Sequence, residues 1–422
     1  MSGYLTSFWL TRGFFTALAA SAFLYLARAG LSYPLSNTFF ALLALILLLS
    51  AKSKTWLASG FFIGLFWFWW IVMSFRFYGF PWAMPIGALL IATIYALLFW
   101  SAALLSEWIG KKLNLSPVWP KALFLLTASY LHPFGFDWFK PELMLTESYF
   151  GVCKWQFALI LLSLSLLLSR RRAFYLLLLL PALQAGISVE RKPLDPQTIE
   201  LVTTHISIRT KWDPGKLTMQ IDLVKKRIDR AIAEGKRLIV FPESVLPLFL
   251  NRERELQGWL MEKSRSISIV LGSLKWDNGV PRNSTYIFEK RSVQIIDKVI
   301  LVPFGESNPL PEWLSDWVNK IFYDGAVDYQ ASGTIADYTL RGRKYRNAIC
   351  YEACSEELYR GRPKRMIVLS NNGWFVPSIE PTEQRLLLQY YSRKYGTTIY
   401  HSINMSPSYI IQNGKVRCAN SL

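Results

Sequence analysis

The chain has 422 residues, a formal net charge of +18 and 52% hydrophobic residues. Residues 1–186 hold only 13 Lys and Arg and four Asp and Glu, whereas the remaining 236 residues hold 34 and 25. This uneven charge excludes a single soluble domain and predicts two parts: a helical membrane domain at 1–186 and a soluble domain at 187–422.

About seven hydrophobic segments follow one another in the first part. They are Phe14–Leu26, Leu35–Ser50, Trp56–Phe75, Pro85–Leu105, Ala122–Leu131, Trp155–Leu168 and Ala173–Gly186. A membrane-spanning helix needs roughly 20 apolar residues, a length that the third and fourth segments reach. The first, fifth and last are shorter and fit tilted, re-entrant or interfacial helices. A secretory signal alone does not explain the pattern, because its apolar region is far shorter than this run.

Loop charges predict the orientation of these spans. With seven spans, nine of the 13 cations fall on one side of the membrane and four on the other. The cation-rich side stays cytoplasmic, so an odd number of spans places residues 187–422 outside the cytoplasm. We therefore expect a multi-pass protein of the bacterial inner membrane with a periplasmic soluble domain. Its positive charge favours anionic lipid headgroups as partners, and no nucleic-acid motif stands out.

The second part alternates between strand and helix patterns. β-branched or apolar runs predict strands, and apolar residues spaced for one helix face predict helices. The expected strands lie within 198–207, 237–244, 267–276, 284–306, 345–353, 365–375 and 398–406, and the expected helices within 215–235 and 381–396. This alternation predicts a layered α/β domain, in which polar residues at strand ends are the first candidates for a site.

The cysteines and histidines do not indicate a metal site. The chain has Cys153, Cys350, Cys354 and Cys418, with His132, His205 and His401 scattered among them. A C-x3-C pair without a second Cys or His pair is poor zinc spacing. No metal and no cofactor is expected. A Cys350–Cys354 disulfide is an alternative in an oxidising compartment, and simple packing of Cys350 at a strand end is another.

Three polar residues follow predicted strands: Glu243 in "VFPES", Lys298 in "IIDKVILVPFGE" and Cys350 in "NAICYEA". Each by itself is ordinary, as a loop carboxylate, a strand-edge charge or a packed thiol. Together they form a complete set for covalent catalysis. A thiol attacks as its thiolate, a carboxylate can take its proton, and a lysine can stabilise both the thiolate and an oxyanion.

The order Glu, Lys, Cys at these strand ends resembles the nitrilase (carbon–nitrogen hydrolase) superfamily. The flanking words "TKWDPG", "KVILVPFGE", "ICYE" and "SNNGWF", together with the hydrophobic first half, resemble its membrane-tethered apolipoprotein N-acyltransferase branch. The resemblance covers nearly the whole chain. It implies an α-β-β-α sandwich behind the membrane domain.

The resemblance also implies roles for individual residues. Glu243 would be the general base, Lys298 the oxyanion stabiliser and Cys350 the nucleophile. Supporting residues would be Glu306, Tyr351, Glu352, Trp212 and Asn283. The implied reaction moves an acyl chain from a membrane phospholipid to Cys350 as a thioester, and then to the amine of a lipid-modified protein or another amine acceptor.

Some sequence segments depart from the family pattern. Asn372 stands where the family commonly has aspartate, and no apolar run follows Gly414, whereas a further membrane helix is expected in the lipoprotein enzymes. A shortened relative, the conjugal transfer protein TraB, is therefore an alternative with the same chemistry and an unknown acceptor. A carbon–nitrogen hydrolase that uses water as the acceptor is a second alternative.

Overall fold

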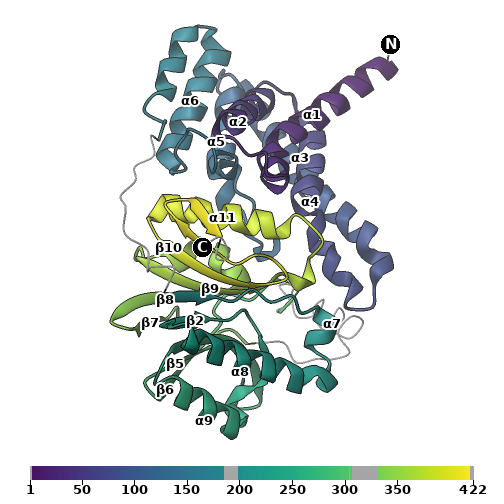
Figure 1. Cartoon of the computed structure of the whole chain (residues 1–422). Helices are drawn as coiled ribbons and strands as arrows, with labels where there is room; N and C mark the ends of the chain where they lie inside the picture. The colour runs from purple at the N-terminus through teal and green to yellow at the C-terminus, as the bar shows by residue number, and fades with distance from the viewer. Residues whose placement is uncertain (1, 185–197, 304, 307–329, 419–422) are drawn as a thin grey trace. The chain divides into compact units, whose positions relative to one another are not determined.

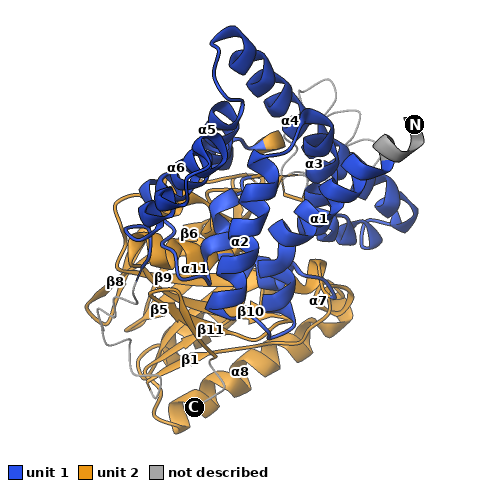
Figure 2. Ribbon diagram, turned by 90° about the horizontal axis from the view of Figure 1, so that it is seen from above, with its two compact units in different colours: residues 1–132, 137–187, 377–386 blue, residues 133–136, 188–376, 387–422 orange. Residues whose placement is uncertain are grey.

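The computed structural model describes residues 2–184, 198–303, 305–306 and 330–418. Its residues cluster into two compact units (Figures 1 and 2). The first comprises residues 1–132, 137–187 and 377–386, and the second comprises 133–136, 188–376 and 387–422. Two short segments thus cluster with the unit on the other side of the predicted boundary. That boundary, after residue 186, stays a prediction, since it falls outside the described residues.

The first unit is helical, and its helices overlap the expected hydrophobic segments. They are α1 (Ser2–Arg28), α2 (Pro34–Leu49), α3 (Ser53–Phe68), α4 (Met84–Lys112), α5 (Val118–Thr127) and α6 (Lys154–Arg170), with the 3-10 helices η1 (Trp69–Arg76) and η6 (Ala173–Leu179). The first helix is longer than the expected segment, because its polar first turns continue the same helix. The last expected segment forms only the short η6 within its described part.

Among the described residues, three helical stretches are long and apolar enough to cross a membrane: Ser7–Arg28, Ser53–Arg76 and Pro81–Lys112. The helix α2 is apolar but shorter. The expectation of about seven spans therefore stays a prediction.

Glycines let α3 and α4 pack closely. A Cβ at Gly60 would lie 2.5 Å from the Tyr95 carbonyl oxygen, and one at Gly64 would lie 2.8 Å from Tyr95 Cβ. Small residues at such contacts allow helix backbones to approach where lipid supplies no hydrophobic drive for association. The sequence GFFIG at 60–64 thereby explains why these two apolar helices pair.

The second unit holds two mixed sheets. In the described residues, the first sheet has the order β1-β2-β4-β5-β6, with β3 paired to β4. Its strands are β1 (Ile199–Leu201), β2 (Leu238–Val240), β3 (Leu246–Phe249), β4 (Ser268–Asp277), β5 (Val280–Glu289) and β6 (Ser292–Asp297). The pairs β1–β2, β2–β4 and β3–β4 are parallel, and β4–β5 and β5–β6 are antiparallel.

The second sheet has the order β12-β11-β10-β9-β8-β7. Its strands are β7 (Asp337–Leu340), β8 (Arg343–Ile349), β9 (Arg365–Asn371), β10 (Thr398–Asn404), β11 (Tyr409–Gln412) and β12 (Lys415–Cys418). The central pairs β8–β9 and β9–β10 are parallel. The short strands β7, β11 and β12, like β3 of the first sheet, were not among the expected elements, because they are only four residues long.

The two sheets pack face to face and helices cover them, which confirms the expected α-β-β-α layering. One apolar core joins Val240 and Val270 of the first sheet to Leu369 and Tyr400 of the second. A second core joins the outer face of the first sheet to α8 (Leu217–Ala233) and α9 (Arg254–Lys263). The helix α11 (Glu380–Tyr395) lies over the second sheet (Figure 1).

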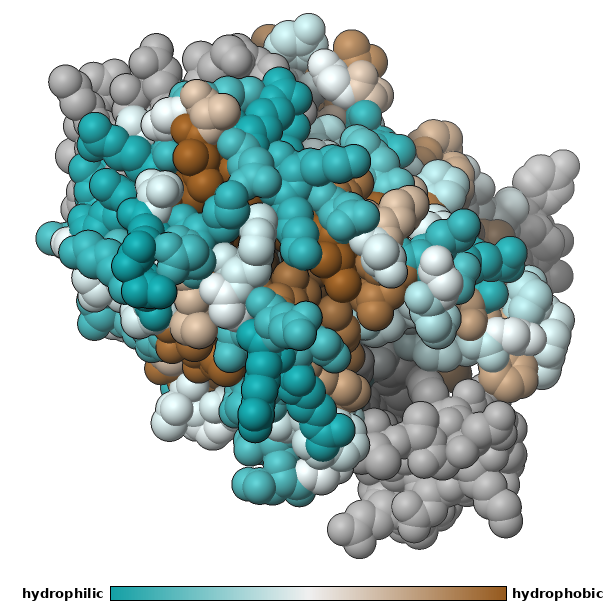
Figure 3. Space-filling model, turned by 60° about the horizontal axis from the view of Figure 1, so that its bottom comes forward, coloured by the Kyte–Doolittle hydropathy of each residue, from teal (hydrophilic) through white to brown (hydrophobic). Residues whose placement is uncertain are grey.

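The surfaces of the two units differ in character. Figure 3 views the molecule from the bottom of Figure 1, where α8 and α9 lie, and most side chains on this face are hydrophilic. In the helical unit, large apolar side chains such as Leu35, Ile86 and Leu90 are exposed. Exposed apolar side chains on long helices are expected where the surrounding solvent is lipid.

Candidate active site

Strand ends of the first sheet place three predicted site residues at one edge. Glu243 follows β2, and Lys298 directly follows β6. Because β4 is parallel to β2 while β5 and β6 alternate in direction, the start of β5 and the end of β6 lie at the same edge as the end of β2. Asn283, near the start of β5, reaches this edge too, and the Lys298 amide donates to the Asn283 carbonyl at 2.9 Å.

Four of the predicted residues form one buried polar cluster. The Lys298 ammonium lies 2.6 Å from Glu306 Oε2 and 3.9 Å from Glu243 Oε1. The Asn283 amide donates to Glu243 Oε1 at 2.8 Å and to Glu306 Oε1 at 3.1 Å. Lys298 is only 1% exposed. A buried ion pair is stable when hydrogen bonds satisfy its remaining polar atoms, and Asn283 does this for both carboxylates.

Cys350 joins this cluster from the second sheet. It follows β8 and begins the 3-10 helix η9 (Cys350–Cys354). Its φ is +55°, a left-handed conformation that residues other than glycine rarely adopt and that is typical of functional turns. Negative charge on the Cys350 sulfur contributes to raising the pKa of Lys298, so the two groups interact electrostatically. The thiol therefore lies within electrostatic range of the lysine that pairs with the two carboxylates.

Burial and charge shift the acid–base equilibria of the cluster. Burial raises the pKa of the Glu243 carboxyl above its ordinary value, while Lys298 opposes the rise and Glu306 adds to it. Burial alone would lower the pKa of Lys298, but the neighbouring negative charges, Glu306 first, outweigh it and raise that pKa. Lys298 thus remains an ammonium ion, and Glu243 is the carboxylate better suited to accept a proton near neutral pH.

Glu352 connects the lysine strand to the cysteine turn. Its carboxylate accepts hydrogen bonds from the backbone amides of Val299 at 2.7 Å, Ile300 at 3.1 Å and Ile349 at 2.7 Å. These amides directly follow Lys298 or precede Cys350. Burial raises the pKa of Glu352 to about 7, although Lys298 and the three amides lower it. Glu352 therefore links the segment after Lys298 to the segment before Cys350.

Tyr351 and Trp212 lie at the margin of the cluster. The Tyr351 hydroxyl donates to the Gly135 carbonyl at 3.2 Å, and its ring stacks on Phe136 with centroids 5.9 Å apart. The Trp212 side chain is 38% exposed at the end of α7 (Ile208–Lys211). Trp212 is thus a surface residue. It lies beside the cluster because the preceding residue, Lys211, contacts the backbone of Glu243.

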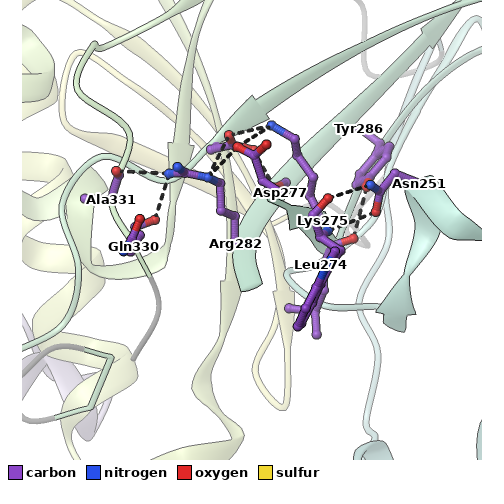
Figure 4. A network of polar contacts seen from close by, with 11 residues as sticks. Asn251, Leu274, Lys275, Asp277, Arg282, Tyr286, Gln330 and Ala331 are labelled. Atoms are coloured by element: carbon purple, nitrogen blue, oxygen red, sulfur yellow. Dashed lines mark hydrogen bonds and ion pairs between the residues drawn. The ribbon is translucent and has the colours of Figure 1, made fainter. Parts of the chain in front are cut away.

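Lys275, Asp277 and Arg282 belong to a charged network at the ends of β4 and β5 (Figure 4). Lys275 lies 3.0 Å from Asp297, and Arg282 lies 2.9 Å from Asp277. Arg282 also donates to the carbonyls of 330 and 331 at 3.3 and 3.1 Å. Arg282 and Asp297 each precede a cluster residue, and alternation along a strand places them on the other face. The network therefore holds the register of β5 and β6 at the site.

One member of the site was not predicted from sequence. Lys211, in "TKWDPG", is 1% exposed and donates to the backbone carbonyls of Glu243 at 3.0 Å and Ser244 at 3.1 Å. Its only signal in the sequence is its position directly before Trp212. A lysine in a polar loop is normally solvated, so sequence alone did not distinguish it.

The structure bears on two alternatives for the cysteines, a disulfide and a metal site. Cys350 and Cys354 are not joined by a disulfide. In the part of the chain that the structure describes, no group of three His, Cys, Asp or Glu side chains is arranged to hold a metal ion. The role of Cys350 as a nucleophile, with Glu243 as its base and Lys298 as the neighbouring cation, stays a prediction.

The sequence is similar to a set of named proteins. The profile of the apolipoprotein N-acyltransferase integral membrane domain matches residues 7–187. The chain is 43% identical over 404 residues to the apolipoprotein N-acyltransferase of Wolinella succinogenes, covering 94% of each chain. It is 37% identical to that of Helicobacter pylori, covering 87% of this chain and 86% of the relative. For Campylobacter jejuni the identity is 31%, with 96% and 90% covered.

Solved structures that match include two proteins of the nitrilase or CN-hydrolase superfamily. An amidase from Nesterenkonia has a TM-score of 0.39 and 14% identity, covering 52% of this chain and 83% of its own. A protein from Xanthomonas campestris has a TM-score of 0.38 and 16% identity, covering 52% and 84%. With identities this high to the full-length relatives, the chain is a multi-pass membrane enzyme that belongs to the apolipoprotein N-acyltransferase family.

Proposed function

We propose that this membrane acyltransferase moves an acyl chain from a phospholipid, through a thioester on Cys350, to the α-amine of a lipid-modified N-terminal cysteine on a lipoprotein. The observation that carries the proposal is the cluster of Glu243, Lys298 and Asn283 beside the Cys350 turn. The names of the relatives support this acceptor over the alternatives of a TraB-like accessory protein and a carbon–nitrogen hydrolase.

In the first half-reaction, Glu243 accepts the Cys350 thiol proton and the sulfur attacks the ester carbonyl carbon of the lipid. The Lys298 ammonium stabilises the oxyanion of the tetrahedral intermediate. The carbon–oxygen bond to the glycerol then breaks, and Glu243 returns its proton to the leaving alkoxide. A lysophospholipid leaves and the acyl chain stays on sulfur.

In the second half-reaction, the acceptor amine attacks the thioester carbonyl. Glu243 accepts the proton that the amine loses, Lys298 again stabilises the oxyanion, and the carbon–sulfur bond breaks. The Cys350 sulfur recovers a proton from Glu243. Splitting the transfer in two replaces one difficult step by two easier ones.

We also propose that the domain division lies at 1–186 and 187–422, and that the catalytic domain is periplasmic on the bacterial inner membrane. The excess of Lys and Arg in alternate loops of the first part supports this orientation. A cysteine-reactive reagent that cannot cross membranes tests it. Cys418 of intact spheroplasts is expected to react if the domain is outside, and protection until the membrane is opened would contradict the orientation.

The test of the reaction is the intact mass of the purified protein. Incubation with a defined phospholipid is expected to add one acyl chain, and a diacylglyceryl peptide with a free α-amine is expected to remove it. Cys350→Ala is expected to gain no mass while keeping its fold. An acyl adduct that the peptide does not remove would indicate another acceptor. An adduct that is lost in buffer without the peptide would indicate a hydrolase. An active Cys350→Ala protein would refute the thioester.

A further inference from the structure

Lys211 has an unusual environment for a lysine. Its side chain is buried, and its ammonium donates to two consecutive backbone carbonyls, those of Glu243 and Ser244, at 3.0 and 3.1 Å. Among the described residues it forms no ion pair within 4.0 Å. Burying an ammonium costs several kcal/mol unless its donors are satisfied. A neutral side chain of the same length would avoid this cost, so the charge at this position requires an explanation.

The turn that Lys211 holds is the one that carries the proposed base. Ser244 has a φ of +48°, which costs roughly 1 kcal/mol or more for a residue with a Cβ. On its other side the turn lies against Gly272 of β4, where an added Cβ would lie 2.7 Å from Glu243 Cα. The Gly272 amide donates to the Pro242 carbonyl at 3.3 Å. The turn is thus held from two sides, by Gly272 and by Lys211.

Lys211 is itself fixed by its helix. The Ser207 side chain caps α7 by accepting from the Thr210 amide at 3.2 Å. Gln220 of α8 donates to the Lys211 carbonyl at 3.1 Å. The next residue, Trp212, is half-exposed. Lys211 therefore joins the Trp212 loop to the backbone of Glu243.

We propose that Lys211 is a positioning residue for acyl transfer, which holds the carbonyls of Glu243 and Ser244 so that the Glu243 carboxylate faces Lys298 and Asn283. This inference rests on the proposed role of Glu243 as the base. Through the turn, Lys211 sets where the carboxylate sits without touching the substrate. A displacement of about 1 Å at a base costs up to about 100-fold in rate.

Lys211 also acts on Glu243 through its charge. The charged groups that face Glu243 are Lys298 and Glu306 from the β6 side and Lys211 from α7. Burial lowers the pKa of Lys211 to about 8, although Glu243 opposes the shift, and the Lys211 charge in turn lowers the pKa of Glu243. Removing that charge leaves Glu243 protonated to a higher pH, where it no longer accepts the thiol proton.

The test measures the rate of Cys350 acylation by phospholipid, followed by intact mass across a pH series. Lys211→Met keeps the length of the side chain and loses its charge and its hydrogen-bond donors. It is expected to slow acylation by about 10- to 100-fold, with little change in KM. It is also expected to move the acidic limb of the pH–rate profile to higher pH. Lys211→Arg, which keeps charge and donors, is expected to recover part of the rate. Lys216→Met, at an exposed lysine on the same loop, is the matched control and is expected to behave as wild type.

Gly272→Ala provides an independent route, because its methyl group displaces the same turn while leaving Lys211 in place. It is expected to slow acylation without moving the acidic limb in the way that Lys211→Met does. The inference is overturned if Lys211→Met keeps the wild-type rate and profile, or if its loss equals the loss of folded protein with an unchanged profile. If Glu243→Gln is also fully active, the proposed base fails; if Glu243→Gln is inactive while Lys211→Met is normal, only the role of Lys211 fails.

Discussion

The Lys298 ammonium lies 2.6 Å from Glu306 and 3.9 Å from Glu243, so the two carboxylates at this site are not equivalent. Lys298 and Glu306 form the closer pair, and their opposite charges neutralise each other. Glu243 is held mainly by the Asn283 amide and has a raised pKa. Because of this asymmetry, Glu306 keeps the lysine charged and Glu243 is the candidate for the proposed proton transfer.

We expect Glu243→Gln to lower the rate of Cys350 acylation by at least about 100-fold, because the amide cannot accept the thiol proton. The raised pKa of Glu243 also predicts the pH dependence. Below that pKa the carboxyl is protonated, so kcat/KM of the wild type falls as pH falls, with an acidic limb above the ordinary range of a glutamate. A pH–rate profile of acylation checks both points. An unchanged rate in the variant would rule out Glu243 as the base.

Glu306→Ala is expected to accumulate the acyl-enzyme. Without Glu306, Lys298 pairs with Glu243 instead, and the tighter pairing lowers the pKa of Glu243 and weakens it as the base for the acceptor amine. Intact mass after incubation with phospholipid and peptide measures the trapped adduct. The double variant with Cys350→Ala is the control and should gain no mass; release of the adduct at the wild-type rate would contradict this account.

Glu352 predicts how stability depends on pH. Its pKa is raised from 4.5 to about 7 in the folded protein, so the folded state holds this proton more tightly than the unfolded state. This contribution is fully present below about pH 4.5 and is lost as pH rises through about 7. The Tm of the wild type should therefore decline between about pH 4.5 and 7 because of this group. The Glu352→Gln variant should lack this decline.

Glu352→Gln is also expected to be less stable at every pH, by about 1–3 kcal/mol. The three amides around Glu352 are all donors, and the amide nitrogen of glutamine cannot accept from any of them. Thermal unfolding in detergent micelles measures the difference. Equal Tm values for the variant and the wild type would show that these bonds contribute little.

The network of Figure 4 predicts unequal effects for two aspartates. Asp297 accepts from Lys275 at 3.0 Å and from Ser284 at 2.7 Å, and it directly precedes Lys298. Asp277 is the last residue of β4 and is more exposed. Asp297→Asn is therefore expected to lower both Tm and the acylation rate, whereas Asp277→Asn changes the rate little, as partly exposed pairs contribute only about 1 kcal/mol or less. The reverse order would contradict a role for the network in placing Lys298.

A buried carboxyl in the helical unit allows a separate test. Glu383 of α11 is 0% exposed and accepts from the Trp70 indole at 2.7 Å. Burial raises its pKa well above the ordinary value, although the bond from Trp70 lowers it. The folded state thus favours the protonated form, and stability from this group falls as pH rises. Glu383→Gln is expected to retain the Trp70 bond and flatten the decline of Tm with pH, while Glu383→Ala lowers Tm at all pH values.

The hydrophobic segments and the strand patterns were sufficient to predict a membrane domain and a layered α/β domain, whereas the α-β-β-α order of the layers was implied by the family resemblance. Burial in lipid or between sheets requires long apolar runs, and such runs can be recognised without knowing their partners. The short strands β7, β11 and β12 were not predicted, because four residues carry too little pattern. For Glu243, Lys298 and Cys350, sequence predicted the candidates only through their order and their resemblance to a family.

Tertiary structure decided what those residues contact. Glu306 pairs with Lys298 more closely than Glu243 does, and Glu352 accepts hydrogen bonds from three backbone amides. Lys211 could not be identified from sequence, because its partners are backbone carbonyls, which every residue carries. A local pattern reports how far a side chain prefers to be buried, whereas the charge and pKa of a buried group depend on neighbours that only the folded chain brings within a few ångströms.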